Sequence, residues 1–505
     1  MKKKIILFNP KTGLDLEGTI RLPIALLSIS SMIHKKYNVI IIDQRADKDW
    51  KNTLINNLDN NVLCFGVTSM TGRQILHGLS ASKIVKKINK NIKIIWGGVH
   101  SSLLPEQTLQ NKYVDIIVMH EGELTFKNLV EKLDKKQSYK NLKGIAYKDN
   151  KKDENNKSKI KINPRAEFLD LNKLPPLPYH LINVKRYINT MVHNGKYLSM
   201  LHMETTRGCP HKCSFCYNNQ FNVRRWRSLT PEKIIDNIKQ LLAIVPNIES
   251  IHFQDDNFFV NKKRVEEFCH LLIKSKLNIK WRTTCKIDYI KYYDKEFLKL
   301  LKKAGLVMLY FGIESASNRM LKLLKKEFRK KDVKPNIEKL NNAGIDFKCS
   351  FIVGLPTENI KDVNITLDFV RDISKSKRTY IFQIFNYTPF YGTELYDLSV
   401  EMGFKPPKTL EEWGYFDFTA SSDIPWVSKK QKKIFDNLSV LSLFFDGKTQ
   451  TINAGFLFPK YASLIRFLLK LYYPIVNLRC RFKIYNSFLD TYFIKRIVSK
   501  VRVSS

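Results

Sequence analysis

The segment Arg207-Gly-Cys-Pro-His-Lys-Cys-Ser-Phe-Cys-Tyr217 carries three cysteines in the spacing C-x3-C-x2-C. Cys209, Cys213 and Cys216 are close enough in sequence for their thiolates to face one inorganic centre. A [4Fe–4S] cluster needs four ligands, so three cysteines leave one iron open to bind a substrate or a cofactor. The segment therefore predicts an iron–sulfur centre with one open coordination site.

A zinc site is the main alternative for these cysteines. Structural zinc sites use four Cys or His ligands, typically as two pairs, and His211 lies between the cysteines. The chain has no second C-x2-C pair, and its other cysteines stand singly: Cys64, Cys269, Cys285, Cys349 and Cys480. The spacing therefore favours the iron–sulfur interpretation over zinc.

Length and composition indicate a globular protein of several domains. A chain of 505 residues predicts about two or three domains, and its 44% of hydrophobic residues can form real cores. Eight cysteines, three of them clustered, do not look like a disulfide framework, and an oxygen-sensitive cluster predicts a reducing cytoplasm. The apolar run near Met1 spans only four residues, so it predicts a first strand and not a signal peptide.

The formal net charge of +39 raises the question of nucleic-acid binding. Basic proteins gain affinity for nucleic acids by neutralising phosphates. Here the lysines are dispersed along the chain, and no nucleic-acid-binding motif accompanies them. The sequence therefore argues against nucleic acid as the substrate.

Five short apolar runs alternate with helical patterns in the first 150 residues. Such runs predict a parallel sheet covered by helices on both faces. Ligands of sheets of this kind bind beyond the carboxyl ends of the strands. The runs are Ile5–Phe8, Val39–Asp43, Val62–Val67, Ile92–Trp96 and Asp115–Val118.

The carboxyl ends of these runs carry the candidate binding residues of the first domain. Adjacent glycines follow the fourth run, and glycine lets the backbone approach a bulky ligand closely. We expect the residues of this set to form one ligand site: Thr68, Ser69, Gly97, Gly98, Glu121 and Glu123.

A change of composition marks the end of the first domain. Residues 148–164 are polar and charged, which predicts an exposed hairpin tip or a linker. Leu174-Pro-Pro-Leu-Pro178 predicts a stiff, extended connector. The predicted organisation is a first domain at 1–150, a linker at 151–190, a second domain at 191–415 and a C-terminal region at 416–505.

Six further strand candidates alternate with helical segments in the second domain. They are Leu201–Thr205, Ser250–Phe253, Lys280–Thr283, Met308–Phe311, Phe347–Val353 and Tyr380–Phe385. In β/α barrels the chemistry gathers at the carboxyl ends of the strands, and the cysteine segment directly follows the first of these strands. Polar residues or glycines follow others of the set: Asp255, Asp256, Glu314, Ser315 and Gly354. Acidic residues at a strand end can also merely cap the next helix, so that alternative stays open for Asp255 and Asp256.

The second domain resembles the radical S-adenosylmethionine (SAM) superfamily. The cysteine spacing with aromatic Phe215, the run Phe311-Gly-Ile-Glu-Ser315 and the segment Tyr387–Tyr396 carry this resemblance. It implies a partial (β/α)6 barrel and a cluster whose open iron chelates SAM, which is cleaved to a 5′-deoxyadenosyl radical. It also implies that Asp255 and Asp256 lie where the family contacts the SAM amino group, Glu314 and Ser315 near its ribose and methionine parts, and Gly354 near adenine.

The first domain resembles the cobalamin-binding domain of cobalamin-dependent radical SAM proteins. The segments Trp96–Pro105, Asp115–Thr125 and Gly144–Tyr147 carry this resemblance. The Asp-x-His-x-x-Gly motif that supplies an axial histidine in other cobalamin proteins is absent, as in most members of this family. The lower face of the cobalamin is therefore unassigned. The alternative is a flavodoxin-like domain that binds a nucleotide or no ligand, because a fold does not fix a function.

The resemblance implies an α/β enzyme with a doubly wound parallel sheet, a partial (β/α)6 barrel and a helical basic C-terminal region. It implies methylation of an unactivated carbon of a small-molecule, natural-product or lipid substrate, with a [4Fe–4S] cluster, SAM, cobalamin and an external electron donor such as flavodoxin or ferredoxin. The alternatives are a cyclisation or rearrangement with the same cofactors, a radical methylthiotransferase acting on tRNA, and a non-catalytic cobalamin or metal-binding module. The methylthiotransferase would need a second cluster site in the first domain, and Cys64 alone cannot supply one.

The C-terminal tail is basic and apolar. Residues 459–505 hold ten Lys or Arg residues and one acid, Asp490, interleaved with aromatic and aliphatic residues. Basic helices with a large apolar face can lie on an anionic membrane. A helical cap with a buried apolar face is the other interpretation and is favoured, so the protein is predicted to be cytoplasmic, with peripheral membrane association as the alternative.

Overall fold

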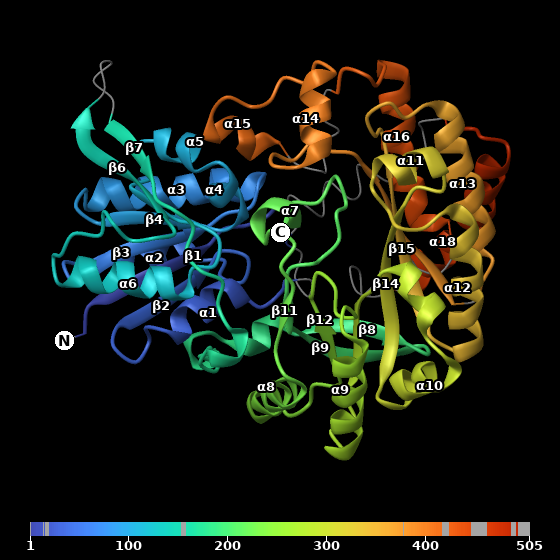
Figure 1. Ribbon diagram of the computed structural model, residues 1–505, viewed down its shortest axis with the longest axis horizontal. Helices are drawn as coiled ribbons and strands as arrows, with labels where there is room; N and C mark the ends of the chain where they lie inside the picture. Colours follow the sequence, from blue (N-terminus) through green and yellow to red (C-terminus); the bar gives the residue numbers. More distant parts are fainter. Residues whose placement is uncertain are drawn as a thin grey trace. The chain divides into compact units, whose positions relative to one another are not determined.

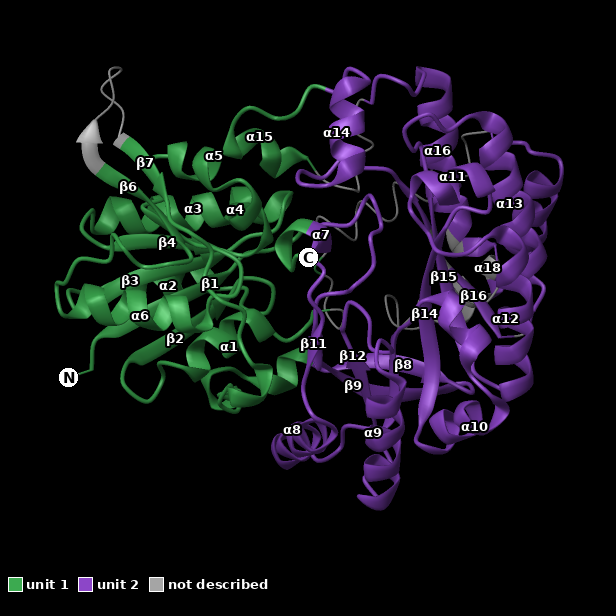
Figure 2. Cartoon of the chain, viewed as in Figure 1, with its two compact units in different colours: residues 1–187, 220–223, 405–417 green, residues 188–219, 224–404, 418–505 purple. Residues whose placement is uncertain are grey.

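The structure is a computed structural model that describes residues 2–13, 15, 20–152, 158–376, 378–416, 424–445, 462–485 and 491–492. The chain divides into two compact units, coloured green and purple in Figure 2. The first contains Met1–Tyr187, Gln220–Val223 and Lys405–Asp417, and the second contains Ile188–Asn219, Arg224–Phe404 and Phe418–Ser505. The predicted limits of the two domains, the linker and the C-terminal region all stay predictions.

The first unit is built on a seven-stranded sheet in the order β2-β1-β3-β4-β5-β6-β7 (Figure 1). The strands β1 to β5 are parallel, and the hairpin of β6 and β7 adds two antiparallel strands. This confirms the predicted parallel sheet, and of the two alternatives for residues 148–164, a hairpin tip or a linker, the pairing of β6 with β7 shows the hairpin. The strands are β1 (Lys4–Asn9), β2 (Asn38–Asp43), β3 (Val62–Thr68), β4 (Lys93–Gly97), β5 (Ile116–Val118), β6 (Ile145–Lys152) and β7 (Ser158–Ile162).

Helices cover both faces of this sheet because its strands are apolar on both faces. Alternate residues of a strand point to opposite faces. Leu7 packs with Leu26 and Phe126 in one core cluster, whereas Phe8 contacts Trp50 at 5.3 Å between ring centroids on the other face. The helices are α1 (Ile24–Ser31), α2 (Trp50–Asn57), α3 (Arg73–Ile88), α4 (Val99–Leu103), α5 (Pro105–Gln110), α6 (Glu123–Asp134) and α15 (Leu410–Tyr415).

The helix α15 joins the first unit although it follows most of the second in sequence. Its Trp413 is 1% exposed and has its ring 5.8 Å from that of His100. The backbone N–H of Gly72 donates to the carbonyl of Trp413 at 3.1 Å. Gly414 lies so close to Leu76 of α3 that a Cβ atom there would come within 2.5 Å of it. This segment therefore packs directly on α3, on α4 and on the loop after β3.

The second unit is built on a curled sheet in the order β16-β15-β14-β13-β12-β9-β8, in which the strands from β9 to β16 are parallel. All six predicted barrel strands are confirmed, and the edge strand β8, antiparallel to β9, was not predicted. The strands are β8 (Asn189–His193), β9 (Lys196–Met203), β12 (Ser250–Phe253), β13 (Lys280–Thr284), β14 (Leu306–Glu314), β15 (Asp346–Val353) and β16 (Thr379–Asn386), with the short ladder of β10 (Thr206–Arg207) and β11 (Arg227–Ser228) beside them.

Several helices of this unit begin and end at clear capping residues. Thr230 caps α8, with Pro231 at its first position, and Asp294 accepts the Phe297 N–H at 2.7 Å to begin α10. Gly344, in the left-handed conformation, ends α12. The helices are α7 (Asn218–Phe221), which begins here, α8 (Pro231–Ile244), α9 (Lys262–Lys274), α10 (Lys295–Lys303), α11 (Asn318–Leu323), α12 (Lys330–Ala343), α13 (Ile360–Ser374), α14 (Glu394–Glu401), α16 (Lys429–Leu441) and α18 (Ala462–Arg481).

The helix α18 exposes apolar side chains along one face. Residues three or four positions apart share a helix face, and the exposed set, which runs just past the end of the helix, follows this spacing: Phe467, Leu471, Ile475, Leu478 and Phe482. Within the described residues, no helix combines the length and the apolar character that crossing a membrane requires. The predicted helical C-terminal region is confirmed for α16 and α18, whereas much of the basic tail lies outside the described residues.

Candidate active site

The cysteine segment leaves the carboxyl end of β9 as a loop held closed at its base. The ladder of β10 and β11 joins Thr206 to Ser228 and Arg207 to Arg227. Gly208, with a φ of +83°, turns the chain into the loop. This conformation is readily available only to glycine, which explains the glycine before the first cysteine. The loop that carries the three thiols is therefore fixed at its base by backbone pairing.

Two adjacent carboxylates hold the start of the loop. Asp255 accepts the backbone N–H groups of Thr205 at 2.6 Å and of Thr206 at 3.0 Å. Asp256 accepts the backbone N–H of Gly208 at 3.0 Å. Burial raises the pKa of both carboxyl groups, and these hydrogen bonds oppose the rise. Both side chains lie against the loop instead of simply capping a helix, and their predicted contact with the SAM amino group stays a prediction.

The other end of the loop docks on two helices. The Ser214 side chain donates to the carbonyl of Leu323, at the end of α11, at 2.8 Å. The backbone carbonyl of Ser214 accepts the backbone N–H of Leu395 in α14 at 3.0 Å. The side chain of Asn219 donates to the carbonyl of Cys213 at 2.8 Å. The positions of the thiols are therefore set by contacts with several elements of the second unit.

The three thiols lie close enough together for one to affect the pKa of another. Burial raises the pKa of Cys209, and it raises the pKa of Cys216 to about 12, with Cys213 adding to both shifts. Asn257 approaches Cys209, with its Nδ2 at 4.0 Å from Sγ. In the described part of the chain no three Cys, His, Asp or Glu side chains converge on one ion position. In a [4Fe–4S] cluster each cysteine thiolate binds a different iron, so the three thiolates need not meet at one ion position. The three cysteines therefore fit such a cluster.

His211, the residue that could complete a zinc site, is engaged elsewhere. Its Nε2 contacts the hydroxyl of Tyr289, and its Nδ1 lies 2.9 Å from the ammonium group of Lys286 and 2.6 Å from Glu327. Both ring nitrogens therefore face these residues, which leaves no ring nitrogen for a metal ion shared with the thiols.

Lys326 is a buried cation that the sequence did not single out. Its Nζ lies 3.4 Å from a carboxylate oxygen of Glu314, donates to the carbonyl of Gly312 at 2.8 Å and sits 5.3 Å from the ring centroid of Phe215. Burial alone would lower the pKa of Lys326, but Glu314 and the thiol of Cys213 raise it. Nothing in the sequence distinguishes this lysine among 86 Lys and Arg residues.

Glu314 ends β14 in a strained conformation. Its φ is +68°, which is uncommon for a residue other than glycine. Burial raises the pKa of its carboxyl group, and Lys326 opposes this rise. A Cβ atom at Gly312 would lie 2.1 Å from its Oε1, so the glycine leaves room for the carboxylate. The structure brings Glu314 to the cysteine loop through Lys326 and Phe215.

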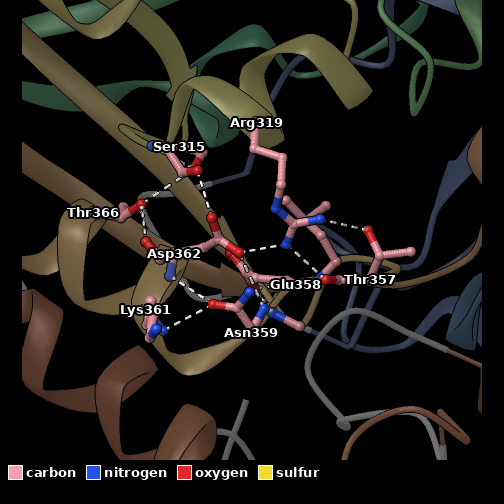
Figure 3. A network of polar contacts seen from close by, with 11 residues as sticks. Ser315, Arg319, Thr357, Glu358, Asn359, Lys361, Asp362 and Thr366 are labelled. Carbon is pink, nitrogen blue, oxygen red and sulfur yellow. Dashed lines mark hydrogen bonds and ion pairs between the residues drawn. The ribbon is translucent and has the colours of Figure 1, made fainter.

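Ser315 belongs to a polar network at the end of β14 (Figure 3), and Gly354 directly follows β15. The Ser315 hydroxyl lies 3.1 Å from that of Thr366, and the Gly354 N–H donates to Glu358 at 2.6 Å. Burial raises the pKa of Glu358 to about 8. These contacts show that both predicted residues stabilise the turns after the strands, and their contact with SAM stays a prediction.

The predicted residues of the first unit gather at the carboxyl ends of three neighbouring strands. Ser69 donates to the carbonyl of Gly97 at 2.9 Å and lies 2.6 Å from the hydroxyl of Ser101. Thr68 ends β3 beside Gly98, whose φ is +94°. The structure therefore brings together the four residues predicted at the ends of β3 and β4.

The two predicted acids after β5 have structural partners. Glu121 accepts the backbone N–H of Leu169 at 3.1 Å, and the buried Glu123 accepts the hydroxyl of Ser28 at 2.7 Å. They lie at the carboxyl end of the strand next to β4, as predicted. Direct binding of a ligand by these acids stays a prediction.

The two adjacent glycines differ in what surrounds them. A Cβ atom at Gly98 would lie 2.5 Å from the carbonyl oxygen of Ser69, so glycine is needed there by the protein's own chain. A Cβ atom at Gly97 would meet only the carbonyl oxygen of Val118, at 3.4 Å. A side chain added at Gly97 would therefore leave the turn intact and would affect only the approach of a ligand.

Two buried polar atoms at this edge fit a ligand that bears hydrogen-bonding groups. Among the described residues, neither His100 Nε2 nor Trp413 Nε1 has a hydrogen-bond partner. Burial lowers the pKa of His100 to about 3, so the imidazole stays neutral and can accept a hydrogen bond. Cobalamin carries amide groups that both donate and accept, so the residues present fit it.

Comparisons with known proteins identify the family of each part of the chain. The family described as the radical SAM superfamily matches residues 203–370, and the B12 binding domain matches residues 18–130. The chain is 30% identical over 406 residues to the uncharacterized methyltransferase PH0819 of Pyrococcus horikoshii, a match that covers 79% of this chain and 83% of that protein.

Two further similarities are informative. The anaerobic magnesium-protoporphyrin IX monomethyl ester cyclase of Rubrivivax gelatinosus is 28% identical over 319 residues, which are 62% of this chain and about half (54%) of the cyclase. The structure of the cobalamin-dependent S-adenosylmethionine radical enzyme OxsB with aqua-cobalamin bound matches with a TM-score of 0.71 and 18% identity, over 99% of this chain and 75% of that chain. The second similarity shows the shared fold.

Proposed function

The chain belongs to the radical SAM superfamily and carries a B12 binding domain, and on this basis we propose that it methylates an unactivated carbon of a small-molecule, natural-product or lipid substrate. The protein is a radical SAM enzyme, and its cofactors are a [4Fe–4S] cluster, SAM and cobalamin. When bound, these groups supply a radical that abstracts hydrogen and a methyl group for transfer. The observation that carries the proposal is the three-cysteine loop after β9 in a chain that also has the doubly wound first unit.

The residues of the second unit have separate tasks in this proposal. Cys209, Cys213 and Cys216 would hold the cluster, which would leave one iron for SAM. Asp255 and Asp256 keep the loop in place through its backbone N–H groups. Lys326 and Glu314 supply charged groups beside Phe215, where hydrogen bonds to a polar ligand would be strong because the groups are buried.

In the first unit, the carboxyl ends of β3, β4 and β5 would hold cobalamin. Thr68, Ser69, Gly97 and Gly98 would form the floor of this site, and His100 and Trp413 would offer an acceptor and a donor. An external electron donor such as ferredoxin or flavodoxin would supply the electrons for SAM cleavage.

The first test uses anaerobically reconstituted, full-length protein. We expect one [4Fe–4S] cluster and production of 5′-deoxyadenosine from SAM under reduction. Replacing Cys209, Cys213 or Cys216 by Ala should abolish both, because each removes one of three protein ligands. Cys480→Ala is the control, since this half-buried cysteine lies in α18. Full SAM cleavage by any of the three loop variants, or tightly bound zinc without iron, would contradict the proposal.

Product mass separates methylation from the alternatives. A methylated product gains one methyl group, whereas a cyclisation or rearrangement product does not. The similarity to a cyclase makes rearrangement the second candidate. A methylthiotransferase would need more cysteines in the first unit, where Cys64 is fully buried in the core cluster around β3.

Membrane association through the basic C-terminal region is a further part of the proposal. The exposed apolar face of α18 supports it, because large exposed apolar patches mark sites that bind a partner or a lipid surface. Lys470, Arg481 and Lys483 are exposed on or next to the same helix and would favour an anionic surface.

A further inference from the structure

Five polar side chains from five neighbouring strands form a layer in the second unit. We call it the basic layer: His202 of β9, His252 of β12, Arg282 of β13, Tyr310 of β14 and Lys348 of β15. The ring of His252 lies 5.4 Å from that of His202 and stacks on that of Tyr310, also at 5.4 Å. Arg282 and Lys348 lie over the Tyr310 ring at 5.6 and 5.9 Å from its centroid.

The basic layer lies on the face of the sheet away from the helices. Neighbouring residues of a strand point to opposite faces. Phe253, which follows His252, packs on Phe268 of α9, and Trp281, which precedes Arg282, packs on the same ring. His252 and Arg282 are half-buried on the other face, as are Tyr310, which contacts both, and Lys348, which lies over the Tyr310 ring.

An apolar floor closes the amino-terminal side of this layer. Met200 and Met308 lie two residues before His202 and Tyr310 on their strands, and they form a core cluster with Met191 and Val307. The inward residues of β/α barrels are usually bulky and apolar. The basic layer, next to the apolar floor, has polar and charged residues at positions that are usually apolar. Packing alone does not require polar residues there.

Three acids on the strands of the layer or directly after them are already engaged with other cations. Glu204 pairs with Arg207 at 3.1 Å, Glu314 with Lys326 at 3.4 Å, and Asp346 with Arg378 at 2.9 Å. Because each of these acids has its own cation, none of them is reserved for Arg282.

Arg282 is the member of the basic layer that points most directly to a ligand. Within the described residues, its buried Nε has no hydrogen-bond partner. Stacking on Tyr310 stabilises the positive charge, but it does not satisfy this N–H group of the guanidinium. Buried polar groups are normally hydrogen-bonded, so an unpartnered donor points to a ligand.

We propose that the basic layer binds an anionic group of the substrate, a carboxylate or a phosphate. The guanidinium of Arg282 matches the two oxygens of such a group, and Lys348 adds a second positive charge. Gly312 lies two residues beyond Tyr310, about 7 Å along the strand, toward the cysteine loop. This inference rests on the proposed function only in naming the ligand as the substrate.

The experiment measures anion binding to reconstituted, full-length protein by calorimetry. Inorganic phosphate and malonate are the probes, with ionic strength held constant by sodium chloride. We expect saturable binding of one anion to the wild-type protein. Arg282→Gln should weaken it by about 10- to 100-fold, because a hydrogen bond to a charged group is lost. Stronger binding of phosphate would indicate a phosphorylated substrate, and stronger binding of malonate a carboxylic acid.

Lys280→Gln is the matched control, because it removes a positive charge from an exposed position on the same strand. It should change the affinity by less than about twofold, since exposed charges are screened. Lys348→Gln gives a second variant of the layer if Arg282→Gln does not fold. Equal weakening by Lys280→Gln, or no saturable binding to the wild-type protein, overturns the inference. SAM cleavage by the wild-type protein is measured separately and tests the proposed function alone.

Discussion

Lys326 and Glu314 form a buried ion pair in contact with the cysteine loop. If Glu314 also binds SAM, as the resemblance implies, Glu314→Gln should lower SAM affinity by about one to two orders of magnitude, because a charge-assisted hydrogen bond is worth about 1.5–3 kcal/mol. Cluster content and cobalamin loading should stay near normal, since neither ligand set is touched. Equilibrium SAM titration beside a thermal melt is the measurement.

Lys326→Met is the companion variant for this pair. It leaves the Glu314 carboxylate buried without its cation, and breaking a buried pair from one side costs about 3–5 kcal/mol. A lower melting temperature with unchanged SAM affinity in Glu314→Gln would show that the glutamate serves only to pair with Lys326.

Gly97 offers a test of cobalamin binding at the scale of one residue. Gly97→Leu places a side chain at the predicted site, where the nearest atom to a Cβ is 3.4 Å away. We expect weaker binding of cobalamin, measured by absorbance titration of the full-length protein, with unchanged iron content and melting temperature. Gly98→Ala is the contrasting variant, because its Cβ would clash with Ser69 and destabilise the turn. Unchanged cobalamin affinity in Gly97→Leu would place the cofactor elsewhere.

At the scale of elements, α18 combines an exposed apolar face with exposed cations. Leu471 and Ile475 are 56% and 53% exposed, one turn apart. Flotation with vesicles that contain phosphatidylserine should recover the wild-type protein. Replacing both residues by Gln should reduce recovery by about tenfold or more, because each buried leucine-sized side chain is worth about 1.5–3 kcal/mol.

Ile360→Gln is the control for this experiment, since Ile360 begins α13 and is 47% exposed. Equal flotation of the α18 variant and the control would mean that the apolar face does not bind the vesicles. If the α18 variant floats like the wild-type protein at low salt and both lose binding at high salt, the attraction comes from charge and not from the apolar face.

At the scale of the whole molecule, the chain returns to its first unit after the barrel strands. Trp413 in α15 packs on His100 and joins the backbone of Gly72. Trp413→Ala should destabilise the first unit by about 3–5 kcal/mol. Hydrogen exchange should then become faster in α3 and remain unchanged in β14 and β15.

Tyr415→Ala is the matched control on the same helix, because Tyr415 is 69% exposed and buries little apolar area. Its exchange rates should match those of the wild-type protein. Equal acceleration in both units by Trp413→Ala would mean that the two units unfold together and would contradict the assignment of α15 to the first unit alone.

The sequence by itself determined the parallel strands of both sheets, the loops after them that carry polar residues, and the three cysteines predicted to bind iron, but not the edge strand β8. Apolar runs and the C-x3-C-x2-C spacing are local patterns, and local patterns are visible without a fold. It could not identify Lys326, the role of Trp413 or the basic layer, because their members are far apart in sequence and ordinary in type. His202 and Lys348 meet around His252 and Tyr310 only because β9, β12, β13, β14 and β15 are neighbours in one sheet. The tertiary structure decided these contacts, since pairing of distant strands is what brings such side chains within a few ångströms.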